Sequence, residues 1–579
     1  MEIEKIRHSA AHILAASVKQ LFPKVKLGMG PAIDDGFYYD FYIEKPFAEE
    51  DLKNIEEKMK EIIKKDYKFK KSKATRKEAE KILKDEPFKL EILRELKDDE
   101  ITFYQDGDFI DLCKGPHVDS TKDVKAIKLL RISGAYWKGD SKNKQMQRIY
   151  GAAFNSEKDL ENYLKLLEEA EKRDHKKIGK EMNLFMISEL VGKGLPIWLP
   201  KGEIIKKEIE KFAIEMENKY GYTRVSTPHL AKQELFIKSG HLPHYKGSMY
   251  PPMQMDDGIY YMKAMNCPIH HLIFSHTLRS YKELPLRIAE YGTVYRNELS
   301  GTLSGLLRVR MLSMNDSHIY CTKEQIAEEI ENVIKLTMEY YKIFGLKDYY
   351  FRLSCWDSKN KEKYINEPNN WELVETTLRE ILKKLKIKFT EAKDEAAFYG
   401  PKVDIQFKTV LGREETLSTI QLDFAAKERF DLRYVDKDTK IKNDVFVIHR
   451  APLSTHERFI AFLTEHYIGK FPLWLSPVQV KLLTITDRNI KFAEEVKKLL
   501  IEQGIRCELN DTAETMNKKV RDAELERVSL IVTIGDKEVE KRTLAIRTLD
   551  NKVKFGVKIE EFINKVVHCI KNRELKCEI

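Results

Sequence analysis

Two histidines lie four residues apart near the start of the chain, as His8 and His12 in the segment HSAAH. On a helix, this spacing places both imidazoles on one face. About a hundred residues later, the segment DLCKGPH repeats the same step with Cys113 and His117. Thiols and imidazoles are ligands of zinc, and imidazoles also transfer protons. The two pairs are therefore candidates for a zinc site or a catalytic centre, and ordinary core histidines remain the alternative.

A second group of candidates is rich in arginine. In YRNELSGTLSGLLRVR, residues 295–310, a Gly/Ser-rich loop is bracketed by Arg296, Arg308 and Arg310. Guanidinium groups match phosphate oxygens in bidentate pairs, and a loop of this kind can close over a nucleotide. A surface hairpin with solvated arginines explains the same residues.

Two further segments add weight to the arginine-rich one. In IHRAPLSTHERFIAFLTEHY, residues 448–467, an expected strand leads into a helix with Arg458 in its first turn, where it either meets a phosphate or forms a surface ion pair. In MKAMNCPIHH, residues 262–271, Cys267 stands beside proline and histidine, and a lone Cys-Pro is usually structural.

In this order, the three segments resemble the catalytic motifs of class II aminoacyl-tRNA synthetases. MNCPIH, RNELSG, NDSHIY, AFYGPKVDI, STIQLDF and VIHRA are similar to successive signatures of the threonyl-tRNA synthetase family. HSAAH, DGFYYDF, DLCKGPH and GAYWKGDSKNKQMQRIYG resemble the bacterial-type editing domain of that family. The resemblance covers about residues 5 to 570, and the family's small N-terminal ubiquitin-like domain is not expected in this chain. It implies a ligase that activates L-threonine with ATP and Mg²⁺ and transfers it to tRNA(Thr).

The resemblance also implies roles for individual residues. Arg296 would hold the α-phosphate of ATP and Arg458 the γ-phosphate, so that charge is neutralised as it develops. The complete set implied to bind ATP is Arg296, Glu298, Arg308, Gln421 and Arg458. Of the further catalytic candidates, Lys402 would lie near the phosphate, and His241 near the terminal ribose of the tRNA as a proton relay.

The zinc implied by the resemblance, one per subunit, would be bound by Cys267, His318 and His449. One thiolate and two imidazoles leave a zinc site open for substrate. Threonine could chelate through its amino and hydroxyl groups, with Asp316 accepting from the hydroxyl and Tyr399 near the amino group. Valine has no hydroxyl, so such a site would reject it far better than an apolar pocket could.

Serine would pass the same zinc site, because it lacks only a methyl group, worth roughly 1–3 kcal/mol. The resemblance therefore implies hydrolysis of Ser-tRNA(Thr) by residues 1–154. That site would comprise His8, His12, Cys113 and His117, with Tyr39, Lys89 and Asp111 holding the ester and the water. Metal-free hydrolysis is the expectation from the family, and a zinc-bound cluster of these residues is the alternative.

The C-terminal segment resembles an anticodon-binding domain. Arg521, Glu538 and Arg547 match anticodon contacts of the family, and Lys518 and Lys519 extend a basic helix suited to phosphates. Each lysine alone also fits a solvated helix face.

Several positions depart from the family pattern, namely Ile269, Met314, Thr416, Ser454, Thr455 and Ala513. The loss of polar contacts should cost nucleotide affinity rather than abolish the chemistry. A functional, diverged ligase is the favoured hypothesis. A non-catalytic or weakly charging tRNA-binding paralogue and a free-standing metallohydrolase are the alternatives.

The elements that must position these residues follow from the sequence pattern. Residues 6–22 have helical periodicity, 49–66 and 74–84 are charged helices, and ITFYQDGDFIDLC predicts a hairpin with its turn at Asp106-Gly107. Residues 156–181 predict one charged helix with Ser156 as its N-cap.

The fold class expected is multidomain α+β and α/β. It comprises an N-terminal α+β editing domain (1–154), a linker helix (155–182), a class II catalytic domain with a mostly antiparallel sheet (183–475) and an α/β anticodon-binding domain (476–579). The catalytic segment lacks βαβ alternation, whereas the last hundred residues show it. The segment GYTRVSTPHL with Pro228 lies where the family forms its dimer, so a homodimer is expected.

Composition sets the remaining limits. The chain has 579 residues and a net charge of +9, which permits a polyanionic partner. Its seven cysteines include no CxxC pair, which argues against a disulfide framework and for a reducing compartment. No stretch approaches the roughly 20 apolar residues of a membrane span, so we expect a cytoplasmic protein without a membrane partner.

Overall fold

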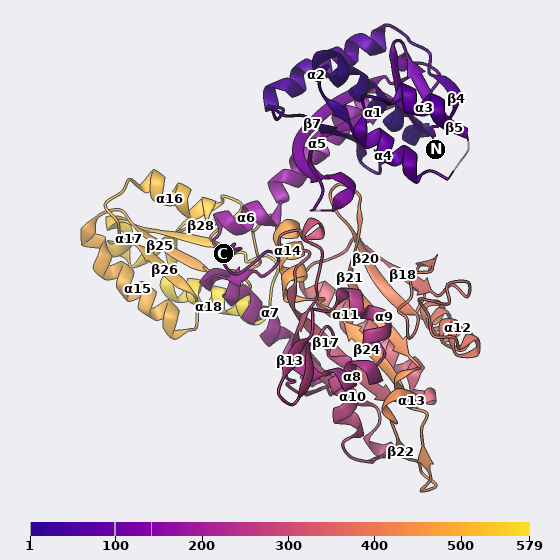
Figure 1. Ribbon diagram of the computed structural model, residues 1–579. Helices are drawn as coiled ribbons and strands as arrows, with labels where there is room; N and C mark the ends of the chain where they lie inside the picture. The colour runs from indigo at the N-terminus through magenta and orange to yellow at the C-terminus, as the bar shows by residue number, and fades with distance from the viewer. Residues whose placement is uncertain (1, 98–99, 141) are drawn as a thin grey trace. The chain divides into compact units, whose positions relative to one another are not determined.

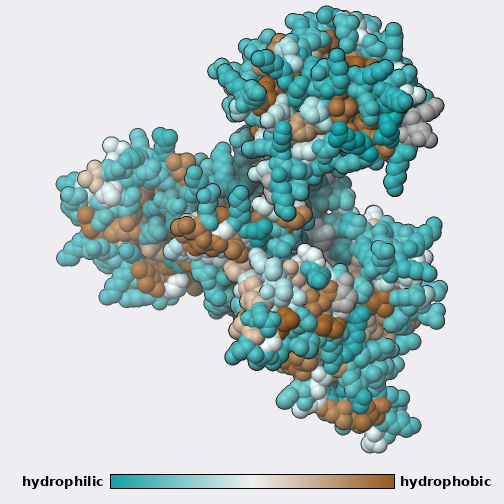
Figure 2. All heavy atoms as spheres, in the orientation of Figure 1, coloured by the Kyte–Doolittle hydropathy of each residue, from teal (hydrophilic) through white to brown (hydrophobic). Residues whose placement is uncertain are grey.

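The computed structural model describes residues 2–97, 100–140 and 142–579, and the chain divides into two compact units, Met1–Glu168 and Glu169–Ile579 (Figure 1). Hydrophilic side chains dominate the visible surface of both units (Figure 2), in keeping with a charged fraction of 34%. Within the described ranges, no helix is both long and apolar enough to cross a membrane.

The first unit is built on a five-stranded antiparallel sheet in the order β1-β3-β8-β7, with β2 paired to β3. Helix α1 (Glu2–Leu21) packs on β3, β8 and helix α2 and buries residues such as Ile13, Leu14 and Val18. The strands are β1 (Lys26–Leu27), β2 (Ala32–Ile33), β3 (Gly36–Tyr42), β7 (Ala126–Tyr136) and β8 (Gln145–Phe154).

A smaller three-stranded sheet, β4-β5-β6, completes this unit. The predicted hairpin is confirmed, since β5 and β6 pair across a turn in which Gly107 has a φ of +58°. The predicted helices are confirmed as α2 and α3 with slightly shorter ranges. The elements are α2 (Glu49–Lys64), β4 (Lys70–Thr75), α3 (Arg76–Ile82), α4 (Pro87–Glu95), β5 (Glu100–Asp106) and β6 (Phe109–Leu112).

The predicted single helix over 156–181 is wrong. The chain forms α5 (Glu157–Arg173) and α6 (His175–Glu181), separated by Asp174, whose φ and ψ of −54° and 115° are not helical. The Asp174 carboxylate accepts from the Lys176 N–H at 2.8 Å, so it caps the second helix and favours the break. The predicted N-cap is confirmed, because the Ser156 hydroxyl accepts from the Asp159 N–H at 3.2 Å.

The second unit is centred on an eight-stranded sheet in the order β11-β16-β17-β24-β21-β20-β18-β19. All neighbours are antiparallel except β11/β16 and β18/β19, which confirms the predicted mostly antiparallel sheet. The strands are β11 (Thr223–Arg224), β16 (Leu286–Tyr295), β17 (Met311–Cys321), β18 (Tyr349–Cys355), β19 (Phe389–Lys393), β20 (Lys402–Lys408), β21 (Glu414–Asp423) and β24 (Phe446–Ala451).

Four long helices share one hydrophobic core with this sheet and bury their apolar faces in it. They are α7 (Pro200–Lys219), α11 (Ile326–Ile343), α12 (Pro368–Lys384) and α14 (His456–Tyr467). Shorter elements surround the sheet: β9 (Phe185–Met186), β10 (Ile197–Trp198), β12 (Leu230–Lys232), α8 (Gln233–Lys238), α9 (His241–Tyr245), β13 (Met253–Met255), β14 (Gly258–Met262), α10 (Cys267–Ser275), β15 (Arg279–Ser280), α13 (Ala426–Phe430), β22 (Tyr434–Val435) and β23 (Ile441–Lys442).

The register of the large sheet aligns several predicted site residues. His318 on β17 pairs with His449 on β24, His449 pairs with Gln421 on β21, and Gln421 pairs with Lys402 on β20. Directly paired residues of antiparallel strands present their side chains on the same face. Four residues that are far apart in sequence therefore form one row across the sheet.

The C-terminal part forms an α/β sheet in the order β26-β25-β27-β28-β29. Strands β26, β25 and β27 are parallel, as the predicted alternation requires, whereas β28 and β29 are antiparallel. The sequence did not predict α17, β29 or α18. The elements are β25 (Val480–Thr484), α15 (Ile490–Glu502), β26 (Cys507–Asn510), α16 (Met516–Leu525), β27 (Leu530–Ile534), α17 (Asp536–Lys541), β28 (Thr543–Thr548), β29 (Val553–Lys558) and α18 (Ile559–Lys571).

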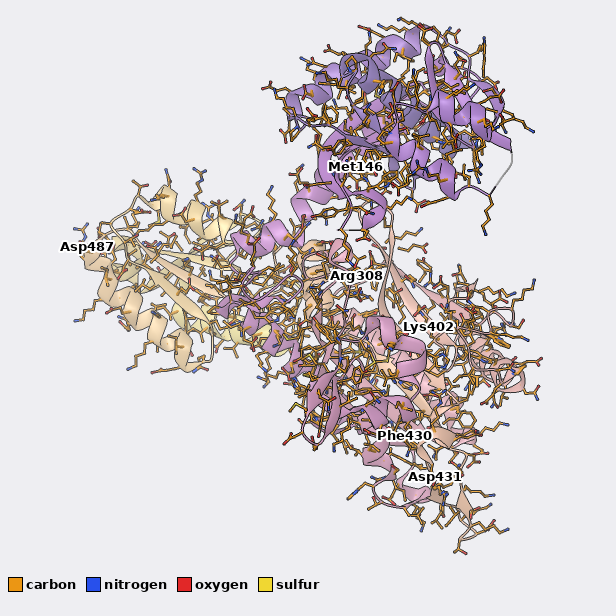
Figure 3. All side chains as sticks on the ribbon, viewed as in Figure 1. Met146, Arg308, Lys402, Phe430, Asp431 and Asp487 are labelled. Carbon is orange, nitrogen blue, oxygen red and sulfur yellow. A yellow bond between two sulfur atoms is a disulfide. The ribbon has the colours of Figure 1, made fainter. Side chains whose placement is uncertain are left out.

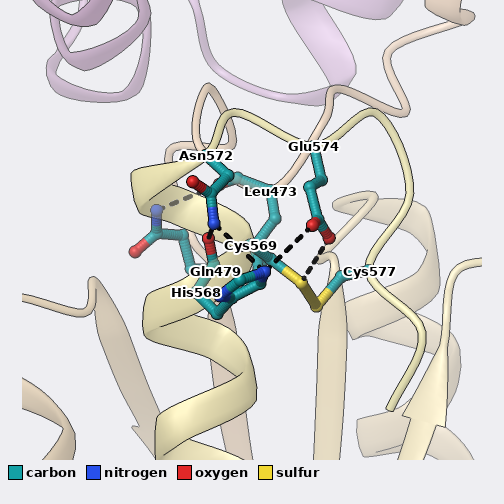
Figure 4. The surroundings of a disulfide bond; sticks show 7 residues. All are labelled: Leu473, Gln479, His568, Cys569, Asn572, Glu574 and Cys577. Atoms are coloured by element: carbon teal, nitrogen blue, oxygen red, sulfur yellow. Dashed lines mark hydrogen bonds and ion pairs between the residues drawn. A yellow bond between two sulfur atoms is a disulfide. The ribbon is translucent and has the colours of Figure 1, made fainter.

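A disulfide, which the cysteine spacing did not indicate, closes the end of the chain. Cys569 in α18 is bonded to Cys577, and Glu574 lies over the pair beside His568 (Figure 4). The other five cysteines are free thiols.

Candidate functional sites

One cavity of about 240 Å³ in the second unit brings together most of the residues predicted for catalysis. Its walls come from the start of α10, the loop 296–310, β17, β21, β24, Tyr399 before β20 and the first turn of α14. The predicted residues that line it are Cys267, Arg296, Glu298, Arg308, Asp316, His318, Tyr399, Gln421, His449 and Arg458.

Three buried donors in this cavity are arranged as ligands of one metal ion. The ligand atoms of Cys267, His318 and His449 all lie within 4.8 Å of one another. Burial lowers the pKa of His318 well below its usual range, so the imidazole is neutral, which is the form that binds metals. One sulfur and two nitrogens with room beside them match the donor set of an open zinc site.

Each histidine of this cluster is oriented by a partner that the sequence did not reveal. His449 Nε2 lies 3.1 Å from Asp423 Oδ2, which leaves Nδ1 for the cluster. His318 Nδ1 lies 2.7 Å from His270 Nδ1, and His270 Nε2 lies 3.0 Å from Glu290. Such outer partners fix the ring and the tautomer of a metal-binding histidine.

Positively charged side chains line the same cavity, namely Arg296, Arg308 and Arg458. Arg458 is held by Leu307 O at 3.3 Å and Thr416 O at 3.4 Å. Burial, together with the nearby charges of Arg296 and Arg308, lowers the pKa of Arg458. Three guanidinium groups around one cavity favour a polyanion such as the triphosphate of ATP.

Asp316, Tyr399 and Gln421 line the same cavity as the arginines and the three-donor cluster. Asp316 Oδ2 accepts from the Asn266 amide at 2.9 Å, and its Oδ1 lies 4.0 Å from His318 Nε2. The Tyr399 hydroxyl donates to Gln421 Oε1, and its ring stacks on His449 at 5.0 Å. A small molecule with an amino group and a hydroxyl has partners here within reach of the cluster.

Two predicted catalytic residues do not line this cavity. Lys402 belongs to the same row of the sheet, but its ammonium pairs with Asp404 at 2.9 Å, and Figure 3 labels it on β20 apart from Arg308. His241 lines a small neighbouring cavity with Cys267 and Tyr399. Burial, followed by the charge of Arg429, lowers the pKa of His241 to about 4, so the ring is neutral at pH 7.

Four of the positions that depart from the family pattern also line the main cavity, and two of them have clear local partners. They are Met314, Thr416, Ser454 and Thr455. The Thr416 hydroxyl accepts from Gln406 at 2.7 Å, and the Thr455 hydroxyl caps α14 by accepting from the Arg458 N–H at 3.1 Å. Thr416 and Thr455 therefore make hydrogen bonds that stabilise the structure around the cavity.

A second cavity of about 460 Å³ lies in the first unit, and six of the seven predicted editing residues line it. They are His8, His12, Tyr39, Lys89, Asp111 and Cys113. The seventh, His117, does not line the cavity but contacts Cys113, with Nε2 3.2 Å from Sγ. The pairs that the sequence placed a hundred residues apart are therefore neighbours.

Hydrogen bonds assign the tautomers of this cluster. The Ser9 hydroxyl donates to Lys5 O at 2.8 Å, so it must accept from the Val118 N–H and from His117 Nδ1, both at 3.1 Å. His117 Nε2 then carries a lone pair that faces Cys113. His8 Nδ1 donates to Pro116 O at 3.3 Å, so its Nε2, 3.3 Å from Cys113 Sγ, also carries a lone pair.

Burial keeps these groups uncharged. It lowers the pKa of His8, lowers that of His117 to about 2 and raises that of the Cys113 thiol to about 11. Two unprotonated nitrogens that face one thiol can accept protons from a water molecule, and the same three donors lie close enough together to bind a metal ion.

His12 lies outside this three-donor group. Its Nδ1 is 3.0 Å from the carboxylate of Asp106, a residue that the sequence analysis used only for a turn. At the same cavity, Lys89 donates to Asp111 Oδ2 at 2.9 Å, and the Tyr39 hydroxyl donates to the same oxygen at 2.6 Å. This buried network fixes an ammonium group and a carboxylate at the edge of the cavity.

The three predicted anticodon residues share a third cavity, of about 600 Å³, in the C-terminal sheet. Arg521 comes from α16, Glu538 from α17 and Arg547 from β28, and Phe555 from β29 completes the wall. The expectation for Lys519 was wrong, because its ammonium is buried and donates to Thr484 O at 2.9 Å. Helical periodicity points this lysine inward, which the charge pattern alone did not reveal.

Comparisons with known protein families match three parts of the chain. Residues 101–150 match the family described as the Threonyl and Alanyl tRNA synthetase second additional domain, residues 252–467 the tRNA synthetase class II core domain (G, H, P, S and T), and residues 477–568 the anticodon binding domain.

Curated relatives cover nearly the entire chain. The threonine–tRNA ligase of Oceanobacillus iheyensis is 45% identical over 578 residues, which span 99% of this chain and 89% of that relative. The threonine–tRNA ligase of Staphylococcus carnosus is 46% identical over 98% of this chain and 88% of its own length.

Solved structures are similar in fold as well. The RNA binding domain of threonyl-tRNA synthetase from Cryptosporidium parvum matches with a TM-score of 0.65 and 31% identity, over 70% of this chain and 99% of that one. A putative threonyl-tRNA synthetase from Aeropyrum pernix matches with a TM-score of 0.61 and 26% identity, over 70% of this chain and 97% of that one.

Proposed function

Because this chain belongs to the threonine–tRNA ligase family, we propose that its two cavities charge tRNA(Thr) with threonine and remove serine charged in error. The ligase class and the editing-type domain come with the family. One observation carries the assignment of residues: a single cavity is lined both by the predicted arginines Arg296, Arg308 and Arg458 and by a three-donor metal cluster. The matches lend no support to a non-catalytic paralogue.

The arginine end of the cavity binds ATP together with Mg²⁺. Arg296 contacts the α-phosphate and Arg458 the γ-phosphate, while Glu298, Arg308 and Gln421 hold the rest of the nucleotide. The threonine carboxylate attacks the α-phosphate, and the bond to the bridging oxygen breaks with release of pyrophosphate. Fixed guanidinium groups stabilise the negative charge that develops, without reorganisation. Lys402, which pairs with Asp404 and belongs to the same row of the sheet, would lie near the phosphate.

The other end of the cavity selects threonine. Cys267, His318 and His449 would hold a zinc ion, which when bound leaves coordination positions for an amino group and a hydroxyl. Asp316 accepts from the substrate hydroxyl, and Tyr399 orients the amino group. Valine offers no hydroxyl, so buried polar groups would lose their partner, and it is rejected strongly. His241 serves as the neutral proton relay for transfer to tRNA.

The first unit hydrolyses the serine ester. His8 and His117 present lone pairs toward Cys113, and one of them takes the proton of the water that attacks the ester carbonyl. The same proton passes to the ribose oxygen of the tRNA as the ester bond breaks and serine is released. Lys89, held by Asp111 and Tyr39, stabilises the oxyanion. His12 supports the cleft through Asp106. We favour hydrolysis without a metal; the close approach of His8, Cys113 and His117 keeps a zinc-bound form as the second candidate.

The remaining proposals concern partners. Arg521, Glu538 and Arg547 read the anticodon of tRNA(Thr) at their shared cavity. The segment 221–230 with Pro228 forms a homodimer interface, which light scattering on the purified protein would test. The protein acts in the cytoplasm, where the tRNA it charges is used.

Amino-acid-dependent ATP–pyrophosphate exchange tests the proposal with zinc-loaded protein. We expect exchange with threonine, weaker exchange with serine and none above background with valine. Absence of exchange with threonine would overturn the proposed function. Metal analysis of Cys267→Ala separates the two editing candidates, because loss of the only bound zinc would exclude a second metal site.

A further inference from the structure

A third group of ionisable side chains, outside both cavities, is formed by Asp174, His175 and Glu465. It joins the start of α6 to the last turn of α14. His175 is only 2% exposed, yet its ring nitrogens both have partners. A buried histidine at the start of α6 therefore contacts α14, the helix that also carries Arg458.

The partners fix the tautomer of His175. The backbone N–H of Leu306 donates to His175 Nε2 at 3.1 Å, so this nitrogen carries a lone pair. The other nitrogen, Nδ1, lies 2.7 Å from Glu465 Oε1 and therefore donates to it. The ring thus links a carboxylate on α14 to the backbone of the nucleotide loop. Both nitrogens are engaged, so the group is not a metal site.

The loop is shaped to admit this ring. Gly305 has a φ of +49°, and a Cβ built on it would lie 2.2 Å from His175 Nε2. A side chain at this position would therefore exclude the imidazole. The close approach explains why the Gly/Ser-rich loop carries glycine at this position.

The same loop is held a second time by α14. Arg458 Nε donates to Leu307 O at 3.3 Å, one residue beyond the contact with His175. Arg458 and Glu465 are seven residues apart, which is about two helical turns, so they lie on one face of α14. Arg458 on this face therefore holds Leu307 directly. Glu465, on the same face, holds Leu306 through His175. Arg308, the next residue, lines the nucleotide cavity.

We infer that His175 is a positioning residue for ATP binding, through which the linker helix α6 supports the loop that carries Arg308. This inference rests on the proposed function of the main cavity. His175 does not line that cavity, so it acts by holding the backbone of Leu306 rather than by touching the nucleotide.

Two substitutions separate this role from a general structural one. The glutamine side chain of His175→Gln is long enough for its amide oxygen to accept from the Leu306 N–H. The shorter asparagine of His175→Asn can still donate to Glu465, but it does not reach Leu306. We expect His175→Asn to raise the KM for ATP in threonine-dependent exchange by roughly 5- to 20-fold, which equals about 1–2 kcal/mol at 1.36 kcal/mol per tenfold. His175→Gln should stay within about twofold of wild type, and the KM for threonine should change in neither variant.

Asp174→Ala is the matched control, because it removes the cap of α6 without touching Leu306. Equal KM values for ATP in the Gln and Asn variants, or the same rise in Asp174→Ala, would overturn the inference. If wild-type protein shows no threonine-dependent exchange, the proposed function fails instead. Hydrolysis of Ser-tRNA(Thr) and zinc content should be unchanged in all three variants.

Discussion

Replacement of Asp423 by asparagine should weaken zinc binding although Asp423 is not itself a ligand. Its Oδ1 accepts from the backbone N–H groups of Ala425 and Ala426 at 2.7 and 3.0 Å, and Oδ2 is 3.1 Å from His449 Nε2. In Asp423→Asn, the two backbone donors keep the amide oxygen at the Oδ1 position. The amide NH₂ must then face His449, and two donors would meet.

The conflict is relieved only if His449 moves its proton from Nε2 to Nδ1, the nitrogen that faces Cys267 and His318. That tautomer cannot bind a metal ion until the proton moves back. Loss of such an outer partner typically costs 10- to 100-fold in metal affinity, or about 1.4–2.7 kcal/mol. We expect the zinc Kd of Asp423→Asn to rise within this range, with unchanged folding.

The assay is competition for zinc between the apoprotein and a chromogenic chelator, followed by threonine-dependent exchange at increasing zinc concentration. Asp436→Asn is the matched control, because Asp436 Oδ1 also accepts from two backbone N–H groups, both at 2.9 Å, but has no contact with the cluster. A zinc Kd for Asp423→Asn within twofold of that control would refute the proposed orientation of His449.

Three further predictions follow from the same geometry. Ser9→Ala removes the acceptor of His117 Nδ1, so hydrolysis of Ser-tRNA(Thr) should slow roughly tenfold while threonine charging is unchanged; equal hydrolysis rates would exclude this role. Burial raises the pKa of Glu457 from 4.5 to about 7, so its contribution to stability is present below pH 4.5 and lost as the pH rises through 7. Glu457→Gln should therefore raise the Tm relative to wild type at pH 8 and not at pH 4, and a pH-independent difference would contradict the assignment. Arg547→Ala should raise the KM for intact tRNA(Thr) roughly tenfold or more and leave an acceptor-stem minihelix unaffected; an equal loss with both substrates would argue against anticodon contact.

The fold class and the site residues were predicted from two different kinds of information, the pattern of the sequence and the resemblance to a family. Helical periodicity located the helix with His8 and His12, and the absence of βαβ alternation predicted the antiparallel character of the large sheet. Cys267, His318 and His449 came only from the family resemblance, because their proximity depends on pairing between strands far apart in the chain. No spacing rule reports that His318 and His449 will be direct neighbours across β17 and β24.

The residues that the sequence missed are partners rather than reacting groups. Asp423, Glu290, Ser9 and His175 act through hydrogen bonds to side chains or backbone from distant segments. Such contacts leave no local pattern. The errors have local physical causes: the side chain of Asp174 caps a new helix where charge periodicity predicted a continuous one, and Lys519 occupies an inward position on an otherwise basic helix.

The most direct test of the two-site account is aminoacylation of tRNA(Thr) with threonine and with serine, by wild-type protein and by His8→Ala. His8 lines the cavity of the first unit, and none of the residues proposed for activation lines that cavity. The account predicts that threonine is charged equally by both proteins and that serine accumulates on tRNA only with His8→Ala. Serine that accumulates equally with both proteins, or threonine charging that is lost in the variant, would contradict it.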